Sequence, residues 1–171
     1  QRPVFRPPGA TFSNRRLQGG IAAGASISVV TLSGNTTAQI FGTASAGDDI
    51  LVHAHLEEDV RDKGLGGQAG FVGLGAAVAV LNDSSRQTAS LGDTAAILQA
   101  DTLTVTAEAD LSQNVLTGQA ALGVGAAGAA IATITDTGTT VASIGTATIG
   151  RMANQSVGDV TVLSDSQRSS V

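Results

Sequence analysis

Two histidines and the acids beside them are the residues of this sequence best suited to chemistry. His53 and His55 are two residues apart, so on an extended strand both imidazoles lie on one face. Imidazole and carboxylate groups bind zinc, and carboxylates also bind calcium. The candidate metal ligands are His53, His55, Glu57, Glu58 and Asp59. The two histidines alone are an incomplete site, and a solvated strand ending in an acidic turn explains the same residues, so no metal or other cofactor is predicted.

No catalytic or cofactor-binding residue emerges from the other motifs. The chain has no Cys, which excludes disulfides, zinc–thiolate centres and cysteine nucleophiles. Both histidines fall within one expected strand, where no Ser/His/Asp arrangement is apparent. The Gly-rich segments 64–67 and 118–125 lack the Gly-Lys-Ser/Thr of a phosphate loop. We therefore expect a protein that is not an enzyme.

The apolar residues are small, which bears on how a core could be built. Hydrophobic residues make up 42% of the 171 residues, yet there is no Trp or Tyr and there are only four Phe. Enzymes of this size commonly use aromatic side chains in the core and in the pocket. Runs such as GLGAAVAVL (73–81) instead favour sheets that pack closely against one another.

Charge is distributed unevenly along the chain. The net charge is −5, with +4 in residues 1–16 and −9 in the remainder. An acidic body argues against nucleic acid as a partner. Residues 1–18 are rich in Arg and Pro, which predicts an extended arm or linker and no signal peptide, so we expect a mature or excised part of a longer protein. No apolar run reaches the roughly 18 residues of a membrane helix, so the chain is not expected to span a membrane.

The sequence repeats itself about every 51 residues. The first landmark occurs as GASISVV (24–30), GAAVAVL (75–81) and GAAIATI (128–134). The second occurs as TAQIFG (37–42), TASLG (88–92) and VASIG (141–145). The third occurs as DILVHA (49–54), DTLTVTA (101–107) and GDVTVLS (158–164), and a fourth as GQAGFVG (67–73) and GQAALGV (118–124). Inserted residues are expected at Phe41 and within 123–128. The order of the landmarks indicates about three copies of one structural unit.

Each landmark has the pattern of a β-strand. LTVTAEA alternates apolar and polar residues, Val, Ile and Thr are frequent, and turn-forming residues separate the landmarks. We predict an all-β parallel solenoid over residues 19–171, with repeats at approximately 19–66, 67–117 and 118–171. A β-sandwich or roll is the alternative. Whether a repeat forms one wide turn, two turns or three is left open by the pattern.

The repeat unit resembles the β-strand repeats of giant bacterial filamentous surface adhesins, of the filamentous-haemagglutinin-like and leukotoxin-like kinds. The clearest similarity lies in residues 67–110, with weaker copies over about 19–165. The resemblance implies a secreted right-handed β-helix in a cell-surface or matrix fibre, and it carries no catalytic residues. Residues 1–18 match no repeat.

Three functional hypotheses follow. The first is a structural, adhesive module of an extracellular bacterial fibre, whose partners are neighbouring repeats, other copies of the chain, and surface glycans or matrix molecules. The second is a self-polymerising filament subunit, because stacked strands leave unpaired edges at both ends. The third is a carbohydrate-active β-helix enzyme, although Arg86 and Arg151 lie in expected turns without accompanying carboxylates.

Overall fold

The computed structural model describes residues 20–150 and 156–171 as an all-β chain. Each sequence repeat forms one wide turn, here called a rung. Rung 1 contains β1 (Ile21–Leu32), β2 (Asn35–Ile40), β3 (Thr43–Ala44) and β4 (Ile50–Ala69). Rung 2 contains β5 (Val72–Asp83), β6 (Arg86–Leu91), β7 (Ala96–Ile97) and β8 (Ala100–Leu122). Rung 3 contains β9 (Gly125–Asp136), β10 (Thr139–Ile144), β11 (Thr148–Ile149) and β12 (Val157–Ser170).

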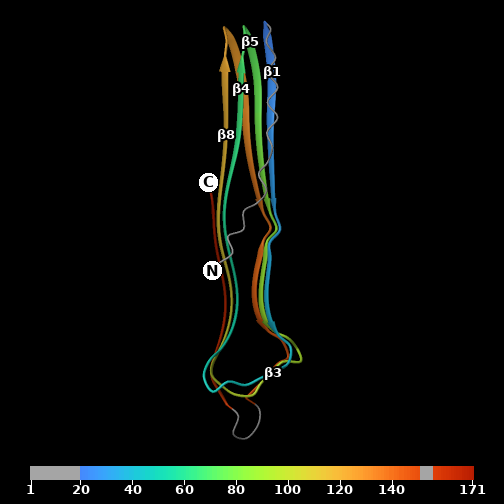
Figure 1. Ribbon diagram of the computed structural model, residues 1–171, viewed down its shortest axis with the longest axis vertical. Helices are drawn as coiled ribbons and strands as arrows, with labels where there is room; N and C mark the ends of the chain where they lie inside the picture. The colour runs from blue at the N-terminus through green and yellow to red at the C-terminus, as the bar shows by residue number, and fades with distance from the viewer. Residues whose placement is uncertain (1–19, 151–155) are drawn as a thin grey trace.

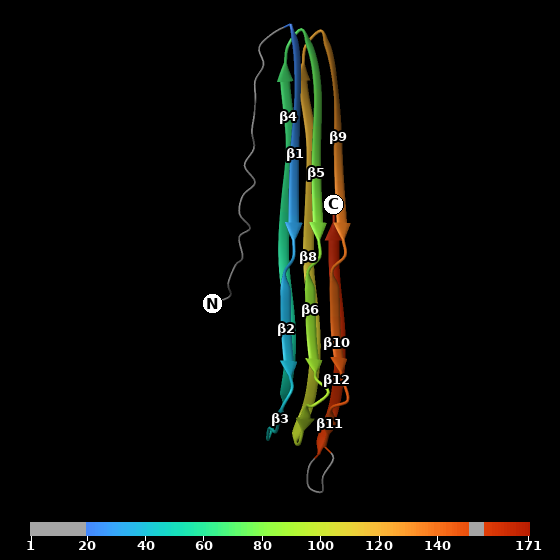
Figure 2. The same ribbon diagram turned by 90° about the vertical axis from the view of Figure 1, so that its right-hand side faces the viewer.

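Equivalent strands of the three rungs pair in parallel and form four sheets. Sheet A is β1-β5-β9, sheet B is β2-β6-β10, sheet C is β3-β7-β11, and sheet D is β4-β8-β12. Sheets A and B follow one another along one layer, sheet D forms the opposite layer, and sheet C lies at the corner that joins them (Figures 1 and 2). The predicted parallel β-solenoid is therefore confirmed. Within the described residues there is no helix, and so none that could cross a membrane.

The pairing register of sheets A and B agrees with the sequence alignment of the first two landmarks. Gly24 pairs with Gly75, which pairs with Gly128. Thr88 pairs with Thr37 on one side and with Val141 on the other. The small residues of GLGAAVAVL therefore stack on small residues of the next rungs, as the sequence indicates.

The third and fourth landmarks are shifted relative to the sequence alignment. An alignment of Asp49 with Asp101 would pair Ile50 with Thr102, but Ile50 pairs with Leu103. In the fourth landmark, Gly67 pairs with Ala120 rather than with Gly118. The cause is a difference in length at the corner between sheets B and C. This corner is formed by residues 41–42 in rung 1 and by the longer segment 92–95 in rung 2. The inserted residues therefore lie at this corner of rung 2, and the expected positions, Phe41 and 123–128, were wrong.

Two apolar clusters fill the space between the layers. The first packs Leu91 and Ile97 against Leu103 and Val105, between sheets B, C and D. The second lies between sheets A and D and includes Leu32, Val60, Ala79, Leu81 and Val115. Beyond this cluster, the A–D interface includes small residues, two glutamines and a buried hydrogen bond from Ser28 Oγ to Asp62 Oδ1 at 2.6 Å. A Cβ on Gly75 would lie 2.6 Å from Gln68 Nε2. A larger residue there would displace the glutamine side chains that reach across the narrow interior from the opposite layer.

The predicted division of the chain can be compared with the rungs only in part. The arm at residues 1–18 lies outside the described residues. The strands of the three rungs run over 21–69, 72–122 and 125–170, the last with residues 151–155 outside the description.

Candidate functional site

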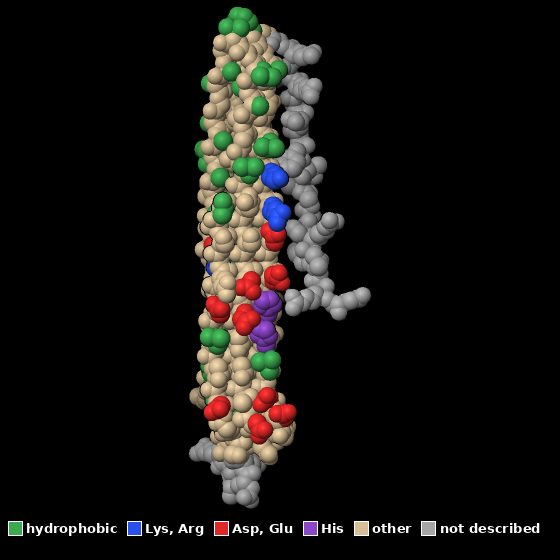
Figure 3. All heavy atoms as spheres, turned by 90° about the vertical axis from the view of Figure 1, so that its left-hand side faces the viewer, with side chains coloured by type: hydrophobic (Ala, Val, Ile, Leu, Met, Phe, Trp, Pro, Cys, Tyr) green, Lys and Arg blue, Asp and Glu red, His purple; other side chains and the backbone are tan. Residues whose placement is uncertain are grey.

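The two histidines meet a glutamate of the neighbouring rung on the outer face of sheet D. His53 Nε2 lies 3.2 Å from Glu108 Oε2, and His55 Nδ1 lies 3.5 Å from the same oxygen. The two imidazole rings are 5.8 Å apart between centroids. One ligand atom from each residue lies within 4.8 Å of the others. Figure 3 shows the two histidines among acidic side chains on this face.

Strand geometry and register together create this cluster. His53 and His55 alternate with the buried Val52 and Ala54 on β4, so they point away from the core. Parallel pairing then places Glu108 of β8 directly beside His55. Each of the three side chains is only partly exposed, with 34–37% of its surface accessible. The cluster thus rests on two rigid strands, which suits the positioning of ligands.

The other predicted metal ligands do not belong to this group of three residues. Glu57 and Asp59 are exposed on β4, and Asp59 forms an ion pair with Arg61, with 2.9 Å between Oδ2 and Nη2. Glu58 belongs to the opposite face of the strand and points inward. Its Oε1 lies so close to Gly34 that a Cβ at position 34 would be only 3.0 Å from it. Three consecutive acids cannot share one face of a strand because their side chains alternate.

Glu108 is the residue that sequence reasoning missed. Aligning the third landmark on Asp49 and Asp101 places His55 opposite Ala107, a buried residue. The actual register is one residue different and brings Glu108 to the outer face. A shift of one residue exchanges the two faces of a strand, so the correct corner length was the signal needed to find this ligand.

A polar layer separates the two apolar clusters inside the solenoid. Asp83 is buried, and its carboxylate accepts hydrogen bonds from Ser85 N at 2.8 Å and from Gln113 Nε2 at 3.3 Å. Arg168 Nη1 lies 3.4 Å from Asp83 Oδ2 and also pairs with Asp136. Asp83 and Asp136 end β5 and β9, at the break between sheets A and B. The break in the ladder thus coincides with a charged contact between opposite layers.

This layer changes the ionisation of two carboxyl groups. Burial, together with the nearby Asp83 charge, raises the pKa of Glu58 despite the opposing effect of Arg168. Partial burial would raise the pKa of Asp136 as well. The hydrogen bond from Arg168, the Gly138 N–H and the Arg168 charge together outweigh burial and lower that pKa.

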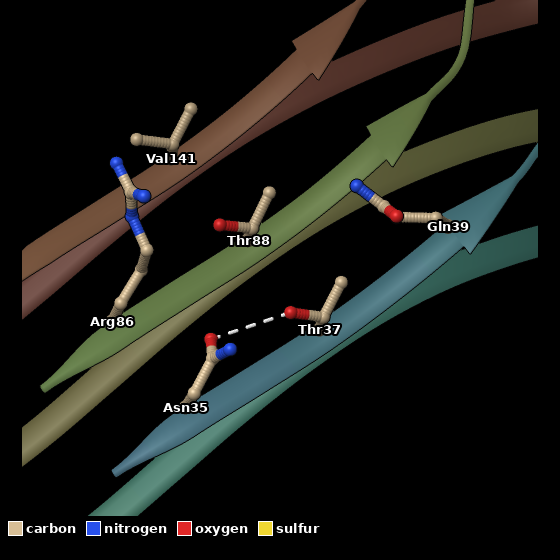
Figure 4. A pocket seen from close by; sticks show the side chains of 6 residues that line it. All are labelled: Asn35, Thr37, Gln39, Arg86, Thr88 and Val141. Carbon is tan, nitrogen blue, oxygen red and sulfur yellow. Dashed lines mark hydrogen bonds between the residues drawn. The ribbon is translucent and has the colours of Figure 1, made fainter. Parts of the chain in front are cut away.

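A shallow groove crosses the three rungs on the outer face of sheet B. Its lining is mostly polar, and Figure 4 shows side chains from all three strands around it. The lining residues are Asn35, Thr37, Gln39, Arg86, Thr88 and Val141. Arg86 donates to Thr139 Oγ1 at 3.3 Å. Because this lining has no carboxylate, imidazole or aromatic ring, it offers hydrogen bonds to a polar ligand but no acid–base pair.

Comparison with known proteins identifies no relative of this chain. No protein-family model, no curated protein and no solved structure matches the chain.

Proposed function

We propose that this chain is a structural, adhesive module of a secreted bacterial surface or matrix fibre, without catalytic activity. The observation that carries the proposal is the uninterrupted in-register stacking of three equivalent rungs. Such a stack extends by adding equivalent rungs, as repeat proteins do. The resemblance of residues 67–110 to adhesin repeats points in the same direction.

The dimensions of a rung suit a surface-displaying role. β4 has 20 residues and β8 has 23, which corresponds to strands of about 65–75 Å at roughly 3.3 Å per residue. Three stacked strands are only about 10 Å deep from the first to the third. A thin, flat body of this shape displays much surface for its mass, which favours contact with glycans or matrix molecules.

The outer face of sheet A supplies an apolar surface for such contacts. Ile27 is 69% exposed and Ile131 is 56% exposed. Val78 lies between them and pairs with each, so the three side chains form one column on the outer face. Ile21, Val29 and Leu74 are also exposed on this sheet. Groups of exposed apolar residues commonly mark interaction surfaces.

A self-polymerising filament subunit is the second candidate, and it is favoured by the sheet edges of the outer rungs, which have no pairing strand among the described residues. On the side of rung 3, the backbone of Thr139 points toward rung 2, where its N–H bonds to Ser85 O at 2.9 Å. Gly145 N–H bonds to Leu91 O in the same way. Because parallel strands alternate the direction of these groups, the N–H of Ala142 points away from the stack. A second copy could pair with this edge.

Electron microscopy over a hundredfold concentration range separates these two candidates. A module gives short particles of constant size, whereas a subunit gives fibres that lengthen with concentration. Ala142→Pro removes the outward N–H at an edge that tolerates proline, so it should abolish fibres without unfolding the rung. Ala142→Ser keeps that N–H and is the matched control.

Binding and turnover assays then test the adhesive role itself. Retention of the purified chain on glycan- or matrix-coated surfaces, without degradation of either, is the expected result. Cleavage of acidic polysaccharides by the purified chain would overturn the proposal and favour a carbohydrate-active enzyme.

A further inference from the structure

The geometry points to a zinc site formed by His53, His55 and Glu108 that joins rung 1 to rung 2. The two histidines come from β4 and the glutamate from β8, so a bound ion would bridge two neighbouring strands of sheet D. This inference is independent of the adhesive role proposed above.

The spacing of the ligand atoms fits a tetrahedral ion. Zinc binds nitrogen and oxygen at about 2.0–2.2 Å, which places neighbouring ligand atoms about 3.3–3.5 Å apart around a tetrahedron. The two imidazole nitrogens lie 3.2 and 3.5 Å from Glu108 Oε2. The third separation, between the two imidazole nitrogens, is within 4.8 Å, so binding requires the side chains of the two histidines to adjust around the ion.

The ligand types select the class of metal. Calcium and magnesium prefer sites made of oxygen atoms, whereas two imidazoles with one carboxylate suit zinc and its neighbours in the first transition row. With three protein ligands, a fourth position remains for water or for a side chain of another molecule, as in open zinc sites.

The charge around the cluster also favours a cation. On the same outer face, Asp110 of β8 and Asp165 of β12 are exposed, and Asp165 pairs in register with Glu108. Asp59 of β4 also lies on this face, but it pairs with Arg61. Arg61 and Lys63 follow further along β4, beyond Asp59. The predominantly negative surface would attract a divalent cation toward the histidines.

A histidine–glutamate hydrogen bond without metal is the competing explanation of the same contacts. At 3.2 Å, the contact between His53 and Glu108 satisfies hydrogen-bond geometry. The two explanations differ in a measurable way. A hydrogen bond needs no ion, whereas a metal site binds one equivalent of zinc and requires all three side chains.

Zinc titration of the full chain at pH 7.5 tests the inference by calorimetry and by NMR of the imidazole protons. The chain has only two histidines, so both signals can be followed without ambiguity. We expect one equivalent of zinc to bind, both imidazole signals to shift together, and the unfolding temperature to rise, because binding to the folded state stabilises it.

Single substitutions establish whether the three residues act together. Glu108→Gln, His53→Gln and His55→Gln should each weaken zinc binding at least tenfold and remove the rise in unfolding temperature. Asp110→Asn is the matched control, because it removes the same charge two residues along the outer face of β8 and should change affinity less than threefold.

Three results would overturn the inference. The first is no binding of zinc at millimolar concentration. The second is unchanged affinity in Glu108→Gln, which would leave the glutamate outside the site. The third is an equal loss in Asp110→Asn and Glu108→Gln, which would indicate general attraction of cations to the acidic face.

Discussion

Rung 2 and the two outer rungs have related sequences but very different burial. Leu91 of β6 is 1% exposed, whereas its register partners Ile40 and Ile144 are only half-buried. Leu81 is 0% exposed, whereas its partners Val30 and Ile134 are half-buried. The difference arises because rung 2 has a neighbour on both sides and each outer rung has one among the described residues.

This comparison separates the role of the sequence from the role of position in the stack. In the two apolar clusters, the inward-facing residues are apolar in all three rungs because each rung must bury one face. The degree of burial depends on how many rungs cover a residue. The same substitution should therefore have effects that depend on the rung that carries it.

The largest expected effect is the loss of a large side chain in the central rung. Leu91→Ala should lower the free energy of unfolding by about 3 kcal/mol, because it removes buried contacts and leaves a cavity. Ile144→Ala, in the same column of rung 3, should lower it by only about 1 kcal/mol, because less apolar surface is withdrawn from water. Both values are measured by urea unfolding. Circular dichroism is the signal to follow, because the chain has no Trp or Tyr to provide intrinsic fluorescence. Equal losses would contradict the comparison.

An intermediate effect is expected from the polar layer. Asp83→Asn should lower the free energy of unfolding by about 2 kcal/mol, because the carboxylate accepts from Ser85 N and pairs with Arg168. Asp110→Asn, on the exposed outer face, should change it by less than about 0.5 kcal/mol. The same urea measurement applies. A stability unchanged by Asp83→Asn would show that the contacts of the Asp83 carboxylate with Ser85 N and Arg168 do not contribute to folding.

The smallest expected effects are opposite shifts in pH dependence. The pKa of Glu58 is raised above its ordinary value of 4.5, so its ionisation opposes folding as pH increases through the raised pKa. Glu58→Gln should therefore gain stability relative to the unmodified chain toward neutral pH.

Asp136 should behave in the opposite sense. Its pKa is lowered below 3.8, so its stabilising contribution is present above that pH and is lost as pH falls through the lowered pKa. Asp136→Asn should be less stable than the unmodified chain at neutral pH, and the difference should vanish in acid. Thermal unfolding between pH 2 and 7 distinguishes the two variants, and parallel profiles would contradict both assignments.

Much of the fold was predictable because the repeat pattern is strong. The landmarks at residues 24–30 and 75–81 indicated stacked strands, and the shortage of aromatic residues indicated a narrow interior. The number of turns per repeat was not predictable, because strands of 6 residues and of 20 residues have the same alternation. Corner lengths were missed because Gly92 resembles Gly42 in sequence although four residues, 92–95, form the second corner.

The candidate site was predictable only in part. The sequence placed His53 and His55 on one face, which the structure confirms. Glu108 lies 53 residues beyond His55, so its approach depends on a register that a two-residue change in one corner determines. Arg168 and Asp83 meet across the interior at a separation of 85 residues, which no local pattern indicates.

The orientation of the long strands makes the mechanical strength of the stack depend on direction. Tension applied along β4 and β8 in opposite senses would load all of the hydrogen bonds over residues 50–69 at once. Tension that pulls one rung away from the next, starting at one end of the strands, would break these hydrogen bonds a few at a time. A fibre built from such rungs would therefore resist shear far better than peeling, and the orientation of its anchor points would decide how well it survives flow.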